Sequence, residues 1–182
     1  MTRFYTKKGD TGYTSQLGKG RVPKYDQRIE AVGAIDEANA AIALARSMSL
    51  APETNNILLV VQRDLYQIMA EVSTTPDNAI RFRTITAERV TWLEAQTDEL
   101  SPRVIVPDEF IVPGDSKAGA AMDLARSVVR RAERQVAHLW FLKKLDNPEL
   151  LRYMNRLSSL CFVLELLENQ TAGINYPTLA KE

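Results

Sequence analysis

The sequence contains few residues of the kinds that form disulfides, bind zinc or act as protein nucleophiles. Cys161 is the single cysteine and His138 the single histidine among 182 residues, so one chain can build neither a disulfide framework nor a Cys/His zinc site. No serine, histidine and aspartate occur in a recognisable catalytic context, which argues against hydrolysis by a protein nucleophile. We expect Cys161 to lie in the core and His138 to have a partly buried packing role.

The chain also lacks net charge and long apolar segments. Its 23 basic side chains equal its 23 acidic ones, so it has no long-range field for nucleic acid or an acidic membrane, and anions must be bound by local clusters of cations. No apolar run approaches the roughly 20 residues that a membrane-spanning helix needs. The first eight residues carry no apolar signal core. We therefore expect a cytoplasmic protein with neither a nucleic-acid nor a membrane partner.

Beyond Pro23, apolar side chains recur at three- and four-residue steps, which predicts helices. The expected helices run from about Asp26 to Ser47, from Pro52 to Ser73, from Thr86, a good N-cap, to Leu100, from Asp115 or Ser116 to Lys143 or Lys144, and from Pro148 to about Glu168. No segment alternates like a strand, residues 102–114 should be an extended connection, and the last dozen residues look frayed. We expect an all-α fold, a ferritin-like up-down five-helix bundle in a single domain of residues 1–182, with a Gly-rich N-terminal loop.

The N-terminal loop contains four of the eight glycines, Gly9, Gly12, Gly18 and Gly20, interleaved with lysine, threonine and serine. Such a loop can offer backbone N–H groups and ammonium groups to phosphates. It is not a Walker P-loop, because Gly18-Lys19 is followed by glycine and no apolar strand precedes it. The residues alone leave two interpretations open, a phosphate-binding loop and a flexible, solvated arm.

A second cluster of cations lies in the fourth expected helix. Steps of four residues place Arg126, Arg130 and Arg134 on one face, and Glu133 is spaced to orient Arg130. Guanidinium groups that point the same way suit polyphosphate, since each can donate two charge-assisted hydrogen bonds. A solvated helix face with local ion pairs is the alternative.

Two polar residues, Asp36 and Asn39, interrupt the Ala- and Ile-rich first helix. A buried lone carboxylate is costly, and no cation shares its helix face, so we expect Asp36 to find one on another helix or another subunit. Asn155 in the apolar fifth helix raises the same question, and a structural hydrogen bond is the default answer.

Four segments in this order resemble the PduO-type ATP:cob(I)alamin adenosyltransferases, and together they span nearly the whole chain. They are Tyr5–Gly12 with Thr14 and Ser15, Arg21–Lys24 with EAVGAIDEAN at Glu30–Asn39, Phe110–Gly114, and ARSVVRRAER at Ala125–Arg134 with Tyr153–Ser158.

The resemblance implies transfer of the 5′-deoxyadenosyl group of ATP to cob(I)alamin, giving adenosylcobalamin and triphosphate, by a homotrimer with interfacial sites. Arg130, Phe110, Asp36 and Arg126 would be the catalytic residues, with Asp36 paired to Arg126 across the interface and Phe110 against the lower face of the corrin ring. ATP would lie on Thr6, Lys7, Lys8, Gly9, Thr14, Ser15 and Lys24 of one subunit and on Arg130, Arg131, Glu133, Arg134 and Asn155 of its neighbour.

The resemblance places Mg²⁺ on the ATP phosphates rather than in a protein-only site. It also suggests two further partners, a reductase and an adenosylcobalamin-dependent enzyme.

The sequence departs from the family pattern at two positions. Asp115 stands where a second glycine usually follows Pro113-Gly114, and Ala38 stands where leucine is common. Asp115 could be a simple helix N-cap; if the family glycine supplies a positive φ, the loop that carries Phe110 sits differently here. Two alternatives therefore remain: a non-catalytic trimeric ATP/corrinoid sensor or carrier, and a helical scaffold with a solvated arginine face.

Overall fold

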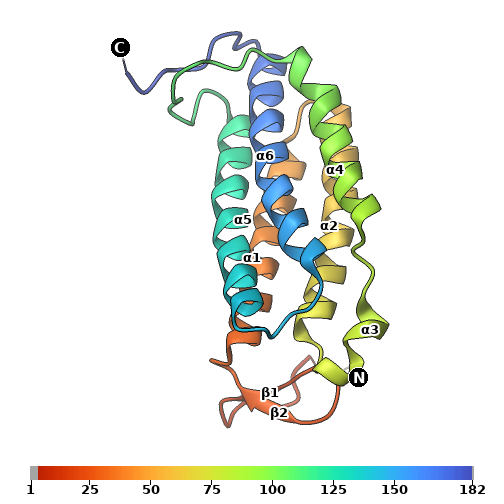
Figure 1. Ribbon diagram of the computed structural model, residues 1–182. Coiled ribbons are helices and arrows are strands. Elements are labelled where there is room, and N and C mark those ends of the chain that lie inside the picture. The colour runs from red at the N-terminus through yellow and green to blue at the C-terminus, as the bar shows by residue number, and fades with distance from the viewer. Residues whose placement is uncertain (1–3, 182) are drawn as a thin grey trace.

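The computed structural model describes residues 4–181, which are mostly helical with one small two-stranded sheet (Figure 1). The α-helices are α1 (Gln27–Met48), α2 (Pro52–Ser73), α3 (Ala79–Phe82), α4 (Ala87–Leu100), α5 (Lys117–Phe141) and α6 (Pro148–Thr171). The strands are β1 (Tyr13–Ser15) and β2 (Arg21–Pro23), and single 3₁₀ turns occupy Pro76–Asn78 and Ser101–Arg103.

Three of the long helices begin at a residue whose side chain caps the first turn. Asp26 accepts a hydrogen bond from the amide of Arg28 at 2.8 Å, Ser116 from that of Gly119 at 2.9 Å, and Asn147 from that of Glu149 at 3.1 Å. Thr86 is the N-cap residue of α4, as expected, but its side chain makes no capping hydrogen bond to the first turn. Capping therefore explains most of the helix starts but not all of them.

The long helices run side by side, with α1 packed against α2 and α5, and α6 packed against α5 and α4 (Figure 1). Their apolar stripes meet in one core, where Ile35, Leu65 and Leu164 are fully buried. Burying such stripes is the main source of helical stability. Asp64 links three helices there, since it accepts hydrogen bonds from Tyr153 at 2.7 Å and from Arg89.

Two features differ from the expected five-helix layout. Residues 4–181 contain a sixth helix, the four-residue α3, and β1 and β2 pair antiparallel with Thr14 opposite Val22. The interpretation of the first twenty residues as loop alone is therefore wrong in part. Strands of three residues are too short to show the alternation that marks a longer strand.

The sheet and the connection after α4 lie at opposite ends of the helices (Figure 1). The C-terminal tail returns to that connection, where Ile111 and Leu179 form an isolated antiparallel bridge, so the tail is not simply frayed. None of the helices in the described part of the chain carries an apolar stretch long enough to cross a bilayer.

Candidate functional site

The N-terminal loop is folded back on itself by backbone and side-chain hydrogen bonds. The amide of Lys24 donates to Gly12 O at 2.9 Å, and the Arg21 guanidinium donates to Tyr13 O at 2.8 Å and also to Lys8 O. A β-carbon at Gly9 would lie 3.2 Å from Lys24 Nζ, so glycine lets this ammonium group approach the loop backbone. The structure thus brings Lys8, Gly9 and Lys24 together, and Lys7 adopts a positive φ of 59° beside them.

The same loop is docked on the end of α2. Leu17 donates to Ser73 O at 3.2 Å and accepts from the amide of Thr75 at 3.1 Å. A cavity of about 630 Å³ lies between this loop, α1 and α2, with Ser15 and Asp36 in its lining. Two of the predicted ATP-site or catalytic residues therefore meet in one apolar-walled hollow.

Gly33 of α1 lines this cavity and also its neighbour of about 400 Å³, which Glu37 and Arg131 line as well. A β-carbon added at Gly33 would have no heavy atom within 4 Å among the described residues outside its own stretch of helix. The face of α1 around Asp36 is therefore open within residues 4–181.

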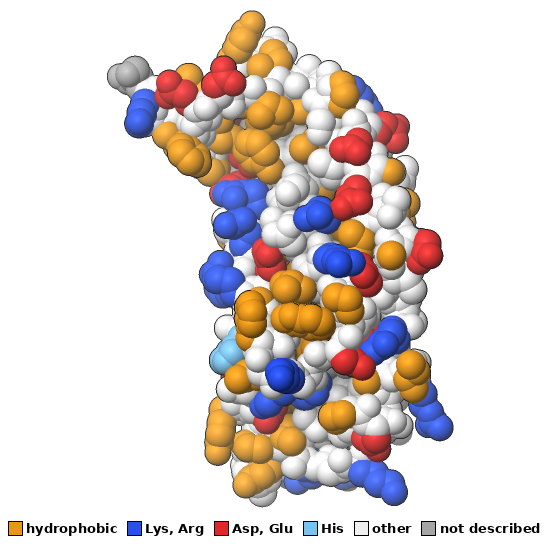
Figure 2. Space-filling view, viewed as in Figure 1, with side chains coloured by type: hydrophobic (Ala, Val, Ile, Leu, Met, Phe, Trp, Pro, Cys, Tyr) orange, Lys and Arg blue, Asp and Glu red, His pale blue; other side chains and the backbone are white. Residues whose placement is uncertain are grey.

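The arginine cluster forms a second, separate hollow. Arg126 and Arg130 of α5 line a cavity of about 330 Å³ together with Ser158 and Phe162 of α6 and Val106 of the connection after α4. Figure 2 shows basic side chains gathered along α5 on this face of the molecule. Two of the three guanidinium groups predicted to share a face thus meet in one cavity, while Arg134 donates to Arg130 O at 3.1 Å instead.

The charged partners in this cluster differ from the expected ones. Glu133 accepts a hydrogen bond from Asn155 Nδ2 at 2.9 Å, so the expectation that it orients Arg130 is wrong. Asn155 is exposed, and its own oxygen accepts from Arg156 at 2.8 Å. Arg131 is paired with Glu37 of α1. Within residues 4–181, the guanidinium group of Arg130 has no carboxylate partner.

The two hollows share no lining residue, and α1 and α2 lie behind α4, α5 and α6 in Figure 1. Asp36 is exposed, and Arg126 donates two hydrogen bonds to Asp123 of its own helix at 2.9 and 2.6 Å. Within this chain, Asp36 is therefore not joined to Arg126, and the N-terminal loop does not reach Arg130.

Phe110 lies on the connection at the far end, with 88% of its surface exposed. The next residue, Ile111, packs against the core, and Gly114 has a positive φ of 126°. Asp115 has no positive φ, so the position that usually holds glycine does not need one here. It does not cap α5 either, because Ser116 does; its carboxylate binds Thr178 of the tail instead.

The lone cysteine and histidine have the following surroundings. Cys161 is fully buried, as expected, and burial raises the pKa of its thiol to about 12, which makes it a poor nucleophile. His138 is exposed, so the prediction of a partly buried packing role is wrong. The described residues contain no group of three or more His, Cys, Asp or Glu side chains that could hold a metal ion.

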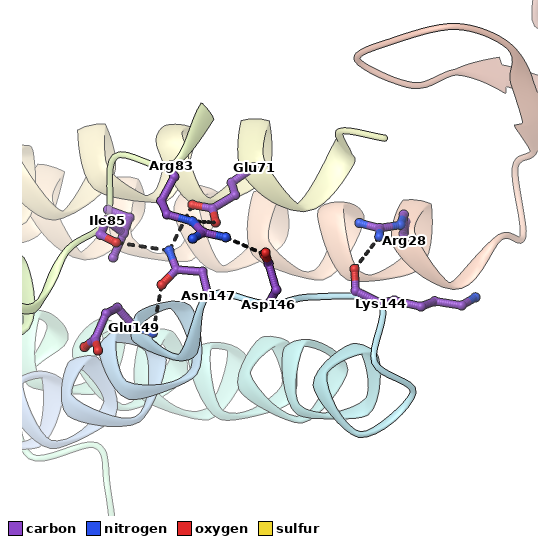
Figure 3. A network of polar contacts seen from close by, with 8 residues as sticks. All are labelled: Arg28, Glu71, Arg83, Ile85, Lys144, Asp146, Asn147 and Glu149. Carbon is purple, nitrogen blue, oxygen red and sulfur yellow. Dashed lines mark hydrogen bonds and ion pairs between the residues drawn. The ribbon is translucent and has the colours of Figure 1, made fainter. Parts of the chain in front are cut away.

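Sequence reasoning gave no sign of a polar network, centred on buried Glu71 and Asn147, beside the start of α6 (Figure 3). Asn147 Nδ2 donates to Glu71 at 3.2 Å and to Ile85 O at 3.1 Å, and Arg83 bridges Glu71 and Asp146. Burial is the main cause that raises the pKa of Glu71, which is only 2% exposed. These residues come from distant parts of the chain and lack a shared spacing, so no motif could reveal them.

Tyr66 and Met69 were also missed, although they line the cavity that holds Asp36. Tyr66 is 64% exposed on α2, and an aromatic residue outside the apolar stripe of that helix was the available signal. The ring of Tyr66 adds an apolar surface to the cavity that Asp36 lines.

The family model, the curated relatives and the solved structures that match this chain all point to one family. Residues 4–168 match the family model described as cobalamin adenosyltransferase. The chain is 35% identical over 173 residues to a corrinoid adenosyltransferase PduO of Citrobacter freundii, covering 94% of this chain and 51% of that protein. It is 34% identical over 176 residues to a corrinoid adenosyltransferase of Bacillus subtilis, covering 94% and 89%. The chain thus spans about half the length of the PduO relative but most of the Bacillus one.

Among solved structures, the fold matches a variant PduO-type ATP:corrinoid adenosyltransferase from Lactobacillus reuteri complexed with cobalamin and ATP. The TM-score is 0.89 at 29% sequence identity, and the match covers 99% of this chain and 100% of that one. A second variant of that enzyme, complexed with ATP, matches with a TM-score of 0.86 at 29% identity, covering 98% of this chain and 100% of that one.

Proposed function

Because the chain belongs to the cobalamin adenosyltransferase family, we propose that it transfers the 5′-deoxyadenosyl group of ATP to cob(I)alamin, giving adenosylcobalamin and triphosphate. The observation that carries the proposal is the state of Arg130. It lines the cavity between α5 and α6, yet within residues 4–181 no carboxylate neutralises it, whereas Arg126 and Arg131 are both paired. An unpaired guanidinium in a hollow suits an anionic substrate.

The site would be completed between subunits. Thr6 to Gly9, Thr14, Ser15 and Lys24 would hold ATP from one subunit, and Arg130 to Arg134 with Asn155 from the next, in a homotrimer. The separation of the two hollows supports this assembly, because neither alone offers both the loop and Arg130. From the open face of α1, Asp36 would form an ion pair with Arg126 of the neighbouring subunit. The long helices would form the ferritin-like up-down five-helix bundle of a single domain.

The chemistry needs no protein nucleophile, which fits the buried Cys161 and the exposed His138. Phe110 would stand against the lower face of the corrin, displace the lower axial ligand and exclude water, which makes cobalt easier to reduce. Cobalt(I) of the substrate then attacks the 5′ carbon of ATP. The cobalt–carbon bond forms as the carbon–oxygen bond breaks, and the triphosphate leaves with the electron pair.

Charge collects on the departing triphosphate, so this chain's cations would act there. Arg130, Lys24 and the loop amides would donate hydrogen bonds to its oxygens in the transition state. With no metal-binding acidic cluster among residues 4–181, Mg²⁺ would be held by the phosphates themselves and would add Lewis-acid neutralisation. Catalysis then rests on positioning and electrostatics.

Replacing Arg130 tests the proposal at the residue that carries it. Arg130→Ala should lower kcat by roughly 10²- to 10³-fold, because it removes a donor to the developing charge. The measurement follows the corrinoid absorbance change and triphosphate release with ATP, Mg²⁺ and cob(I)alamin. The matched control is Arg152→Ala, which removes an exposed guanidinium paired with Glu149 on α6 and should leave kcat unchanged.

Other results would defeat the proposal. Near-wild-type turnover in Arg130→Ala would remove its central residue. Binding of ATP and corrinoid without triphosphate would indicate a sensor or carrier, and ADP or pyrophosphate as product would exclude the proposed bond cleavage. A protein that binds neither ligand would be a scaffold. A reductase that supplies the electron and an adenosylcobalamin-dependent enzyme that takes the product would be the partners, with the cytoplasm as the expected location.

A further inference from the structure

The C-terminal tail and the segment that carries Phe110 are joined by one isolated antiparallel β-bridge. Val112 N donates to Thr178 O at 2.8 Å, Ala180 N donates to Phe110 O at 2.7 Å, and Ile111 faces Leu179. The pairing joins residues far apart in the sequence at an exposed end of the molecule. Two backbone hydrogen bonds in solvent form a weak attachment by themselves.

Asp115 adds a side-chain latch to this pairing. One oxygen of its carboxylate accepts from the amide of Thr178 at 3.0 Å, and the other accepts from the Thr178 hydroxyl at 2.6 Å. Both bonds are charge-assisted and together fix two atoms of one tail residue. Ser116 already caps α5, so the carboxylate is not required for that helix start.

The pairing also fixes which way Phe110 faces. Side chains alternate along an extended segment, and Ile111 is the residue that packs on the core, so Phe110 and Val112 face outward with 88% and 47% exposure. A slip of one residue would turn Phe110 toward the core. Whatever holds the tail in this register therefore holds Phe110 in its outward position.

We propose that Asp115 is a positioning residue, whose carboxylate latches Thr178 and so keeps the Phe110 segment and the C-terminal tail as one unit facing the corrinoid substrate. The role given to the corrinoid rests on the proposed function; the latch itself does not. Asp115, although it replaces a usual glycine of the family, thus stabilises the loop that carries Phe110.

The latch is tested first by amide hydrogen exchange, which needs no activity. Asp115→Ala should speed exchange at Val112 and Ala180 at least tenfold, because both amides donate in the pairing. Asp108→Ala is the matched control, since it removes an exposed carboxylate of the same connection that has no hydrogen-bond or ion-pair partner among residues 4–181, and it should change neither rate. Unchanged exchange in Asp115→Ala would overturn the proposal.

Steady-state kinetics then test the positioning role. Asp115→Ala should raise the KM for cob(I)alamin several-fold and leave the KM for ATP unchanged, because the latch lies at the opposite end from the N-terminal loop (Figure 1). Thr178→Ser keeps both donors and should behave as wild type, whereas Thr178→Val loses the hydroxyl and should share the defect. Faster exchange with an unaltered corrinoid KM would refute the positioning role. An inactive wild-type protein whose latch opens in Asp115→Ala would refute the proposed function and support the latch.

Discussion

Glu165 on α6 has a carboxyl group that is buried without a hydrogen-bond donor among the described residues. Its side chain is 1% exposed, and neither oxygen has a hydrogen-bond donor within the described residues. Burial is the main cause that raises the pKa of Glu165 to about 7, and Asp123 adds to the rise while Arg126 opposes it. The group is thus protonated in the folded protein at pH values where an unfolded chain would have lost the proton.

This difference predicts a pH-dependent stability. Because the folded-state pKa is above the unfolded value of 4.5, stability from this group falls as pH rises from about 4.5 to about 7 and is constant above that. Glu165→Gln should gain about 1 to 3 kcal/mol over the wild type across this window. Urea unfolding at a series of pH values, at one protein concentration, measures the difference. Glu99→Gln, an exposed control, should show no such trend, and a flat difference for Glu165→Gln would mean that the carboxyl is solvated.

At the scale of elements, Asn147 joins three segments around the start of α6 (Figure 3). Its oxygen caps the helix through the amide of Glu149, and its amide group donates to Glu71 of α2 and to Ile85 O before α4. The side chain is 3% exposed, so water cannot easily replace these bonds. Asn147 therefore links α2, the segment before α4, and the start of α6.

Asn147→Ala should lower the free energy of unfolding by about 2 to 4 kcal/mol, because it removes a cap and leaves buried Glu71 and Ile85 O without their donor. Chemical denaturation gives the value. Asn56→Ala on α2 is exposed and should change stability by no more than about 0.5 kcal/mol. Equal effects of the two substitutions would show that neither the cap nor the network in Figure 3 adds to stability.

The helices could be predicted from the sequence because their signals are local. The spacing of apolar residues and Pro52 predict the observed bounds of α2. The predicted first helix begins at Asp26, which is the N-cap residue of α1. α5 ends at Phe141, short of Lys143 or Lys144, because Lys143 adopts a positive φ of 55°. α6 continues to Thr171, beyond the predicted end at Glu168. In its final turn Asn169 lies beside Gly119 of α5 and accepts a hydrogen bond from Ser116 at 2.7 Å.

At the scale of the whole molecule, residue types could be predicted but not their pairings. The loop glycines and the arginine cluster are visible in the sequence, and Gly9 does lie against Lys24. The pairings of Glu133 with Asn155 and of Asp115 with Thr178 depend on how distant segments meet, so spacing alone pointed to other partners. How subunits meet is a prediction that rests on the family resemblance.

Mixing inactive subunits tests whether each site draws on two of them. In a ring of three, random assembly of equal amounts of Lys24→Ala and Arg130→Ala subunits should restore about one quarter of the wild-type sites, because a loop from one variant then meets an arginine from the other. Activity after co-refolding measures the recovery.

The double variant Lys24→Ala with Arg130→Ala, mixed equally with wild type, provides the control. It should leave about one quarter of the sites intact if both residues come from different subunits, but about one half if they come from the same one. No recovery in the first mixture and one half in the second would place the whole site within a single chain.

Gly33, on the open face of α1, lowers the stability of the helix that carries it. A glycine inside a helix costs about 1 kcal/mol relative to alanine. Nothing among the described residues outside its own stretch of helix lies close enough to forbid an alanine there, so contacts within the subunit do not account for this cost. In the cavity lined by Ser15 and Asp36, this chain therefore has exposed backbone that another surface could approach more closely than any side chain would allow.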